Sequence, residues 1–273
     1  MSLTTWSGSL HQTFRLVGAR SRSLVPFLSS GGKTSAEVLS SLPYDSARAA
    51  ASGGGSGGPD AKRYRDARQV YQTAGLVYEG GDSRLRVTQL GLATLRWADI
   101  ITQSNSVILG RHAAYALSAC QLRTPTGSGS RYDESMVVFP FQFIWKAMLA
   151  LDGKITSDEL NREVFRTRNE DDLAASIQRI ATVRKTGNSS SLGEEVITGE
   201  RKNDRIIPWL SLASFGWTLF PDKGGDSFYS IPQNALGIVR EASRIKHKHR
   251  EFESVSEYVE YLSSCACLPK DLR

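Results

Sequence analysis

Arginine, lysine and glutamine side chains gather in one short stretch of the chain, just ahead of the glycine at position 75. Arginine can donate two hydrogen bonds to O6 and N7 of guanine, and glutamine can pair with adenine in a similar way. Positions 65, 68, 69 and 72 recur at helical spacing, so most of these side chains can share one helix face. The spacing indicates a helix equipped to contact base edges in a major groove. The candidate residues for this contact are Lys62, Arg63, Arg65, Arg68, Gln69 and Gln72.

A second group of polar residues stands at the start of another predicted helix. The remainder of that helix, residues 206–212, is apolar, and we expect it to be mostly core. Basic residues near two predicted turns could hold phosphates, which position a protein on DNA without reading its sequence. We therefore expect the first group to carry more base contact and the second to position the protein. The second group is Arg201, Lys202, Asn203 and Arg205, and the turn residues are Arg84, Arg86 and Lys223.

The elements that must position both groups are repeated along the chain. The motif GGDS occurs at residues 80–83 and 224–227 and continues in register, as GGDSRLRVTQLGLATLR and GGDSFYSIPQNALGIVR. Upstream, each copy runs through an apolar-periodic stretch to a glycine, Gly75 or Gly216, which suits the left-handed end of a helix. β-favouring runs flank each GGDS, whose residues tolerate the positive φ of a hairpin turn. Each copy therefore predicts the third helix and the wing of a winged helix-turn-helix unit.

Two earlier helices complete each predicted unit. Thr156 and Glu159 have the spacing of a capping box and predict a helix start at this point. A further amphipathic helix is predicted over residues 169–187. The other predicted helices cover residues 139–153 in the second unit, and residues 11–18 and 34–42 in the first.

The expected fold class is mainly α with small β-hairpin wings, in which tandem winged helix-turn-helix units are joined by a connecting helix. That long linking helix is predicted over residues 97–122, and a short one over residues 255–262. The run SRIKHKHRE at residues 243–251 is a second basic cluster, expected to touch backbone phosphates. The expected divisions are a first winged-helix unit at 1–98 with a flexible Gly/Ser loop at 51–60, a connecting helix and loop at 99–135, a second winged-helix unit at 136–243, and a basic C-terminal helical tail at 244–273.

The order of these parts resembles the tandem winged-helix DNA-recognition region of FokI-type (type IIS) restriction endonucleases. The resemblance runs through GLVY, RVTQLGLA, the connecting helix, FPFQFIWKAMLALDGKITSDEL and a second wing that ends in IPQNALG. It covers roughly residues 64–240 and rests on order and hydrophobic pattern. The resemblance implies sequence-specific binding of double-stranded DNA within a restriction-modification system. In the resembling enzymes a nuclease domain follows on the same chain, so a nuclease domain or subunit is an expected partner.

A nuclease pattern is present only in part. Glu200-x-Lys202 fits the second half of PD-(D/E)xK, in which carboxylates hold Mg²⁺ and a lysine orients the attacking water. No Pro-Asp pair precedes it at a useful distance, and Asp171, Glu194 or Glu195 would have to replace the missing acid. A chance tripeptide is the simpler interpretation, so Glu200 and Lys202 are catalytic candidates without a complete motif. We expect no cofactor, and Mg²⁺ only if a nuclease activity is present.

Two further cofactor patterns are incomplete. His247-x-His249 and Cys265-x-Cys267 have only one residue between their members, which is narrower than the usual zinc-ligand spacing. Residues 31–34 read GGKT, the end of a Walker A motif, but Phe27 stands where that motif requires glycine. We expect no metal site and an ordinary loop at 31–34.

Composition favours an anionic partner. The 273 residues include 34 Lys and Arg against 28 Asp and Glu, which gives a formal net charge of +6. Three cysteines and the lack of a signal-like apolar segment favour a reducing cytoplasm, and no stretch has the length of a membrane span. The leading hypothesis is a sequence-specific DNA-binding protein. The alternatives are a complete Mg²⁺-dependent endonuclease with a cryptic active site, and a winged-helix protein-interaction module or transcription regulator.

Overall fold

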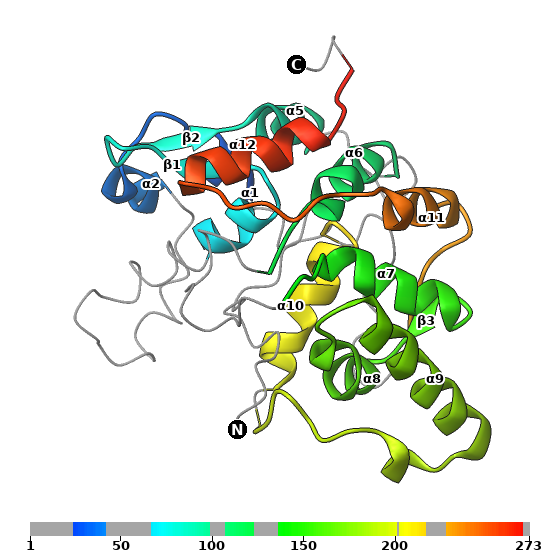
Figure 1. The fold of residues 1–273 in the computed structure, drawn as a ribbon. Coiled ribbons are helices and arrows are strands. Elements are labelled where there is room, and N and C mark those ends of the chain that lie inside the picture. Colours follow the sequence, from blue (N-terminus) through cyan, green and yellow to red (C-terminus); the bar gives the residue numbers. More distant parts are fainter. Residues whose placement is uncertain are drawn as a thin grey trace.

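The computed structural model describes residues 24–41, 67–98, 107–122, 136–200, 202–216 and 228–269. Helices dominate these segments, and two small antiparallel two-stranded sheets accompany them, as the sequence predicts (Figure 1). None of the helices in these segments is long and apolar enough to span a membrane. The helix predicted at 11–18 and the Gly/Ser run at 51–60 lie outside the described residues.

The first unit opens with two short helices, α1 (Leu24–Leu28) and α2 (Ser35–Ser41). The sequence analysis predicts α2 but not α1, which is only five residues long yet buries Phe27 against Tyr71. Thr34 precedes α2 as the first half of a capping box. The Thr34 backbone N–H donates to the Glu37 carboxylate at 2.7 Å, and the Glu37 backbone N–H donates to the Thr34 hydroxyl at 3.5 Å.

The GGKT segment is the turn between α1 and α2. The Gly32 N–H donates to the Leu85 carbonyl at 2.8 Å, and the Leu85 N–H donates to the Lys33 carbonyl at 2.9 Å. These bonds bring Thr34 into an antiparallel bridge with Arg84. The backbone groups of this turn are thus bonded within the fold.

The predicted hairpin of the first unit is present. Residues 67–73 are helical, and the chain turns at Gly75, whose φ is 74°. Strands β1 (Val77–Glu79) and β2 (Leu85–Val87) then pair antiparallel. The GGDS tip closes them, but its positive φ of 58° belongs to Ser83 and not to either glycine. A Cβ at position 80 would lie 2.8 Å from Asp82 Oδ1, which is the end of an exposed side chain that can move aside.

Two helices lead from the first unit to the second. They are α5 (Gln89–Ala98) and α6 (Val107–Ser118). The prediction of a single helix over 97–122 is confirmed for α6, while Trp97 belongs to the end of α5. Residues 99–106 are outside the described part of the chain. Just after the end of α6, Cys120 is buried, and this burial raises the pKa of its thiol to about 12.

The second unit follows the predicted order of helices. Its elements are α7 (Pro140–Ala150), β3 (Lys154–Ile155), α8 (Ser157–Arg162), the 3-10 turn η3 (Val164–Arg166), α9 (Glu170–Thr186), the 3-10 turn η4 (Ser189–Ser191), α10 (Asn203–Ala213), β4 (Tyr229–Ser230) and α11 (Leu236–Arg244). Thr156 and Glu159 form the predicted capping box at the start of α8. The predicted amphipathic helix, α9, is capped at its C-terminal end by Gly187, whose φ is 72°.

Strand β3 is an element that the sequence analysis does not predict. Lys154 pairs with Ser230, and Ile155 pairs with Tyr229, so β3 takes the return strand of the second wing as its partner. In the first unit Thr34 meets Arg84 at the equivalent place, before the capped second helix. The repeat therefore extends beyond the hairpins, to GKTSAE at 32–37 and GKITSDE at 153–159. The first strand and the tip of the second wing, residues 217–227, lie outside the described residues.

The last helix, α12 (Val255–Cys265), returns to the first unit. It packs against β1, α5 and α6 and crosses the top of the molecule in Figure 1. The Ser263 hydroxyl accepts the Leu90 N–H at 3.1 Å, and a Cβ at position 75 would lie 3.1 Å from the Cβ of Leu262. One continuous hydrophobic core runs through both units. The predicted short helix is confirmed. Its packing against β1 and α5 brings the C-terminal part of the described chain onto the first unit.

Candidate nucleic-acid interface

The third helix of the first unit holds two of the predicted base-contact residues near its surface. Val70 and Tyr71 are buried on its inner side. Arg68 and Gln69 are half-buried. The structure therefore keeps this pair as candidates. The other predicted residues before them, Lys62, Arg63 and Arg65, lie outside the described part of the chain.

Gln72 departs from the expectation. Only 7% of this residue is exposed, although the spacing rule placed it with Arg68. A side chain enclosed to this extent does not reach a base edge, so its burial counts against the predicted role and we omit Gln72 from the interface. Arg68 forms an ion pair with Glu79 of β1, which joins the third helix to the wing.

The wing arginines are exposed and already oriented. Arg84 donates from Nη1 to the Gly32 carbonyl at 2.7 Å, and Arg86 pairs with Asp82 at 2.6 Å. Each guanidinium carries five N–H donors in a rigid fork, so one bond leaves donors for a phosphate. Lys33 lies in the same turn as Gly32 and is exposed. The first wing and the turn before α2 thus present three cations together.

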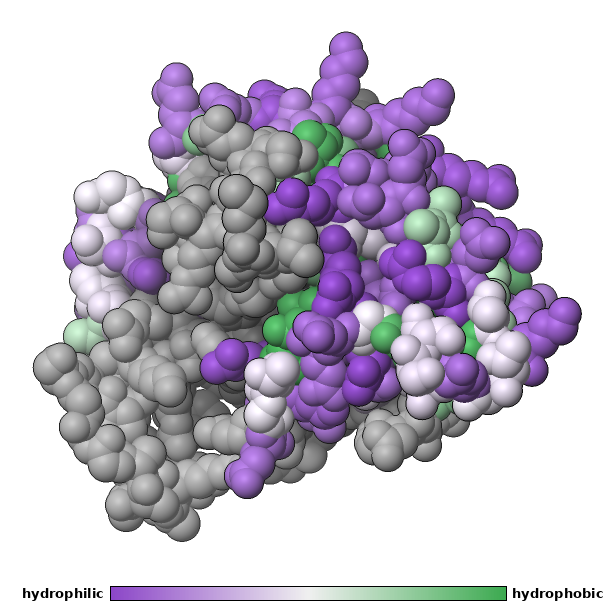
Figure 2. All heavy atoms as spheres, turned by 60° about the horizontal axis from the view of Figure 1, so that its bottom comes forward, coloured by the Kyte–Doolittle hydropathy of each residue, from purple (hydrophilic) through white to green (hydrophobic). Residues whose placement is uncertain are grey.

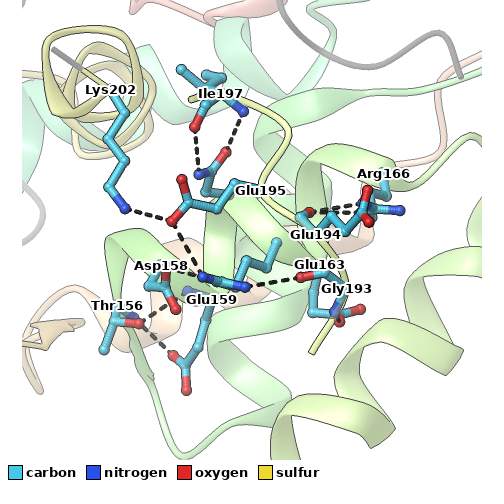
Figure 3. A network of polar contacts seen from close by, with 12 residues as sticks. Thr156, Asp158, Glu159, Glu163, Arg166, Gly193, Glu194, Glu195, Ile197 and Lys202 are labelled. Atoms are coloured by element: carbon cyan, nitrogen blue, oxygen red, sulfur yellow. Dashed lines mark hydrogen bonds and ion pairs between the residues drawn. The ribbon is translucent and has the colours of Figure 1, made fainter. Parts of the chain in front are cut away.

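The second unit holds the segment before α10 by buried polar side chains (Figure 3). The Asn161 side chain donates to the Ile197 carbonyl at 3.0 Å and accepts the Ile197 N–H at 2.8 Å. The buried Glu163 carboxylate accepts the Gly193 N–H at 2.7 Å and the Arg179 Nε–H at 2.8 Å. Charge-assisted bonds of this kind are stronger than neutral ones. Residues 193–197 are therefore fixed on α8 and η3, and the start of α10 is fixed with them.

The start of α10 is exposed, and the rest of the helix is buried. Asn203 and Arg205 are exposed, whereas Ile206, Trp209 and Leu210 are core residues, as the sequence predicts. This helix can meet DNA only with its N-terminal end. Arg201 and Lys223, the remaining predicted contacts of this unit, lie outside the described residues.

Lys202 is occupied by a structural ion pair. Its Nζ lies 2.6 Å from Glu195 Oε1, and Arg162 lies 3.2 Å from the same oxygen (Figure 3). The Lys202 hydrogen bond and the two positive charges lower the pKa of Glu195. Glu200 is exposed and Asp171 lies on α9. The described residues contain no group of three or more His, Cys, Asp or Glu that could hold a metal ion, so the nuclease pattern gains no support from this part of the chain.

The histidine and cysteine pairs are placed as parts of the fold. His247 Nε2 lies 2.8 Å from the Ser118 hydroxyl, and the rings of His247 and His249 both lie against Phe139. Cys265 is half-buried on α12, and burial raises its thiol pKa. These contacts are those of packed side chains.

The overall fold is similar to that of a solved DNA-binding domain. The similar structure is the BpuJ1 endonuclease binding domain, crystallised in complex with pyrene- and phenanthrene-modified DNA. The TM-score is 0.56 and the sequence identity 10%, and the match covers 92% of this chain and 97% of that chain. No protein-family model and no curated protein matches this chain. At 10% identity the likeness is one of fold over almost the full length of both chains.

Two exposed cations, Lys33 and Arg240, are not among the residues that the sequence analysis predicts to contact DNA. Lys33 belongs to GGKT, whose likeness to a nucleotide loop hides the T-x-x-E capping box that begins at the next residue. Arg240 is exposed on α11, in the same register as Arg96 of α5, and the repeat alignment could have indicated it. The basic run at 243–251 was identified, but the sequence did not indicate how it is held.

Proposed function

We propose that this protein binds double-stranded DNA in a sequence-specific manner through two winged-helix units. In the first unit the third helix and the wing contact DNA, with Arg68 and Gln69 near base edges and Arg84 and Arg86 at phosphates. In the second unit the exposed start of α10 contributes Asn203 and Arg205. Arginine and asparagine are the residue types that discriminate guanine and adenine in a major groove.

The fold carries this proposal. A DNA-complexed endonuclease binding domain has the same fold over 97% of its length, and the sequence independently places arginine, glutamine and asparagine on the third helices of two repeated units. Fold alone does not define function, because winged helices also dock proteins. The residues at the expected contact points are what favour DNA.

The described surface fits an anionic partner better than an apolar one. On the face shown in Figure 2, hydrophilic residues predominate and hydrophobic residues form only small, separate spots among the described atoms. The large hydrophobic residues that are exposed in the described segments are Leu92, Val137 and Phe228, on three different parts of the chain. Docking modules usually present a contiguous apolar patch.

We further propose that the chain is the target-recognition part of a restriction endonuclease of the FokI-like type IIS kind. Cleavage in such an enzyme belongs to a separate nuclease domain or subunit, with Mg²⁺ required only there. Residues 200–202 take no part in cleavage in this proposal, because Lys202 is committed to Glu195.

The decisive experiment is selection of bound duplexes from a random DNA pool at near-physiological salt, with Mg²⁺ added in a parallel reaction. We expect an enriched motif for the wild-type protein. The variant Asn203→Ala/Arg205→Ala should relax the motif at a few positions, by about 1–3 kcal/mol for each lost base contact. Arg84→Ala/Arg86→Ala should weaken binding to all sequences alike.

A matched control removes two exposed cations that are outside the proposed interface, Arg96→Ala/Lys185→Ala. This variant should keep both the motif and most of the affinity. The absence of an enriched motif for the wild-type protein would refute sequence-specific recognition. Cleavage with Mg²⁺ that Lys202→Ala abolishes would instead establish the complete nuclease.

A further inference from the structure

A basic strap joins the two units across the surface of α6. It consists of residues 244–250, which start at the last residue of α11 in the second unit and lead toward α12, the helix that packs on the first unit (Figure 1). Residues 245–250 form neither helix nor strand. From residue 236 to residue 250 the chain carries five Lys and Arg and a single acid, Glu241, which is paired with Arg111. Much of the excess positive charge of the whole protein lies in this stretch.

The strap alternates between an inner and an outer side. Residues 245, 247 and 249 are half-buried, and residues 246, 248 and 250 are exposed. This period of two is typical of an extended chain, whose successive side chains point in opposite directions. Arg244, Lys246 and Lys248 are exposed and make no ion pair or side-chain hydrogen bond within the described part of the chain.

Buried glutamines hold the strap in place at both ends. Gln142 of α7 donates from Nε2 to the Ile245 carbonyl at 2.8 Å. Gln121 pairs with the backbone of Arg250 twice: its amide donates to the carbonyl and its oxygen accepts the N–H, both at 2.9 Å. Between these anchors, His247 bonds Ser118. The backbone is thus fixed before any ligand arrives, while the lysine side chains remain available.

We propose that the strap is a second DNA contact, which binds the phosphate backbone of duplex DNA outside the bases that the winged helices read. The proposal rests on DNA binding as the proposed function, but it assigns a site that neither the winged-helix units nor their wings contain. A row of cations on an extended, anchored backbone suits a periodic polyanion and lacks the hydrogen-bonding variety needed for base readout. Burial lowers the pKa of His247, so at neutral pH this ring adds no charge to that of the strap's lysines and arginines.

The test measures binding of a random-sequence duplex as a function of salt. For B-DNA, the slope of log affinity against log salt falls by about 0.9 for each phosphate that the protein neutralises. Lys246→Ala/Lys248→Ala should therefore make this slope shallower by about 1.8 between roughly 50 and 200 mM salt. Lys246→Arg/Lys248→Arg should retain the wild-type slope, and Arg96→Ala/Lys185→Ala should change it less than the strap variant does. A strap variant whose slope equals that of the wild type would overturn the proposal.

A second arm separates the strap from the recognition surface. In the pool selection, the strap variant should enrich the same motif as the wild type, with lower affinity for every sequence. Loss of the motif itself would contradict a backbone contact. If no motif is enriched even by the wild type, sequence-specific recognition fails, yet the salt slope on random duplex still decides whether the strap binds DNA. Equal melting temperatures of the variants confirm that the fold is intact.

Discussion

The side chain of Asn161 pairs with the backbone of Ile197 as a neighbouring strand residue would. One amide N–H donates to the carbonyl and the amide oxygen accepts the backbone N–H, and Asn161 is completely buried. This pair fixes the polar segment that leads into α10. The exposed start of α10 therefore depends on a residue of α8 that touches no solvent.

Asn161→Ala should destabilise the protein by roughly 2–4 kcal/mol, because it leaves a buried N–H and a buried carbonyl of Ile197 without partners. Urea denaturation measures the change. Asn188→Ala removes only hydrogen bonds of an exposed turn and should cost far less. An equal cost for the two variants would show that the Asn161 pair does not hold the segment.

Glu163→Gln tests the second anchor of the same segment. Glu163 is fully buried, and its carboxylate accepts from Gly193 and Arg179. The amide replaces one acceptor by a donor, so one charge-assisted bond is lost at a cost of about 1.5–3 kcal/mol. Glu241→Gln weakens an exposed pair with Arg111 and should cost less than about 1 kcal/mol. Equal unfolding free energies for the two variants would contradict the anchoring role.

Gly91→Ala should destabilise the first unit because α5 lies directly on the hairpin. A Cβ at position 91 would clash with the Leu76 carbonyl and would lie 2.7 Å from Val87 Cγ1. Overpacking of this kind costs typically about 1–3 kcal/mol. Gly237 of α11 has no atom within 4 Å of such a Cβ, so Gly237→Ala should leave stability unchanged or raise it by up to about 1 kcal/mol. Thermal unfolding of both variants compares the two sites.

Stability should fall as the solution is acidified, in part through His247. Burial lowers its pKa in the folded protein below the ordinary value, so below about pH 6.5 the unfolded chain takes up a proton that the folded form resists. The stability that the neutral His247 ring contributes is fully present above that pH. It is lost as the pH falls through the lowered pKa, by at most about 1.4 kcal/mol of unfolding free energy for each pH unit. Urea denaturation of His247→Gln should show a smaller loss between about pH 7.5 and 5.5. Ser118→Ala, which keeps the ring buried, should retain the wild-type loss.

Local sequence signals predicted those parts of the fold that depend on neighbouring residues. The capping box of Thr156 and Glu159, the helix end at Gly216 and the first hairpin all follow from short patterns, and each is present. Strand β3 could not be predicted in this way, because its two residues are defined by pairing with Tyr229 and Ser230, some 75 positions later. Its local sequence reads equally well as a turn.

In the candidate site, too, features set by neighbouring residues could be predicted, and features set by tertiary contacts could not. Exposure of Asn203 and Arg205 followed from the apolar residues after them, since one helix end must face solvent when the rest is core. The burial of Gln72 did not follow, because helical spacing defines a shared face but not which neighbour covers it. The pairing of Lys202 with Glu195 did not follow either, because it depends on how the segment that leads into α10 folds back toward the start of that helix.

The return of α12 to the first unit bears on how the protein can be dissected. The helix covers β1 and α5, and its Ser263 bonds the Leu90 backbone, so the core of the first unit includes residues from the far end of the described chain. A fragment ended at residue 135 would leave that core open to water and prone to aggregation. Truncation from the C-terminal side therefore removes α12 first, and with it part of the core of the first unit.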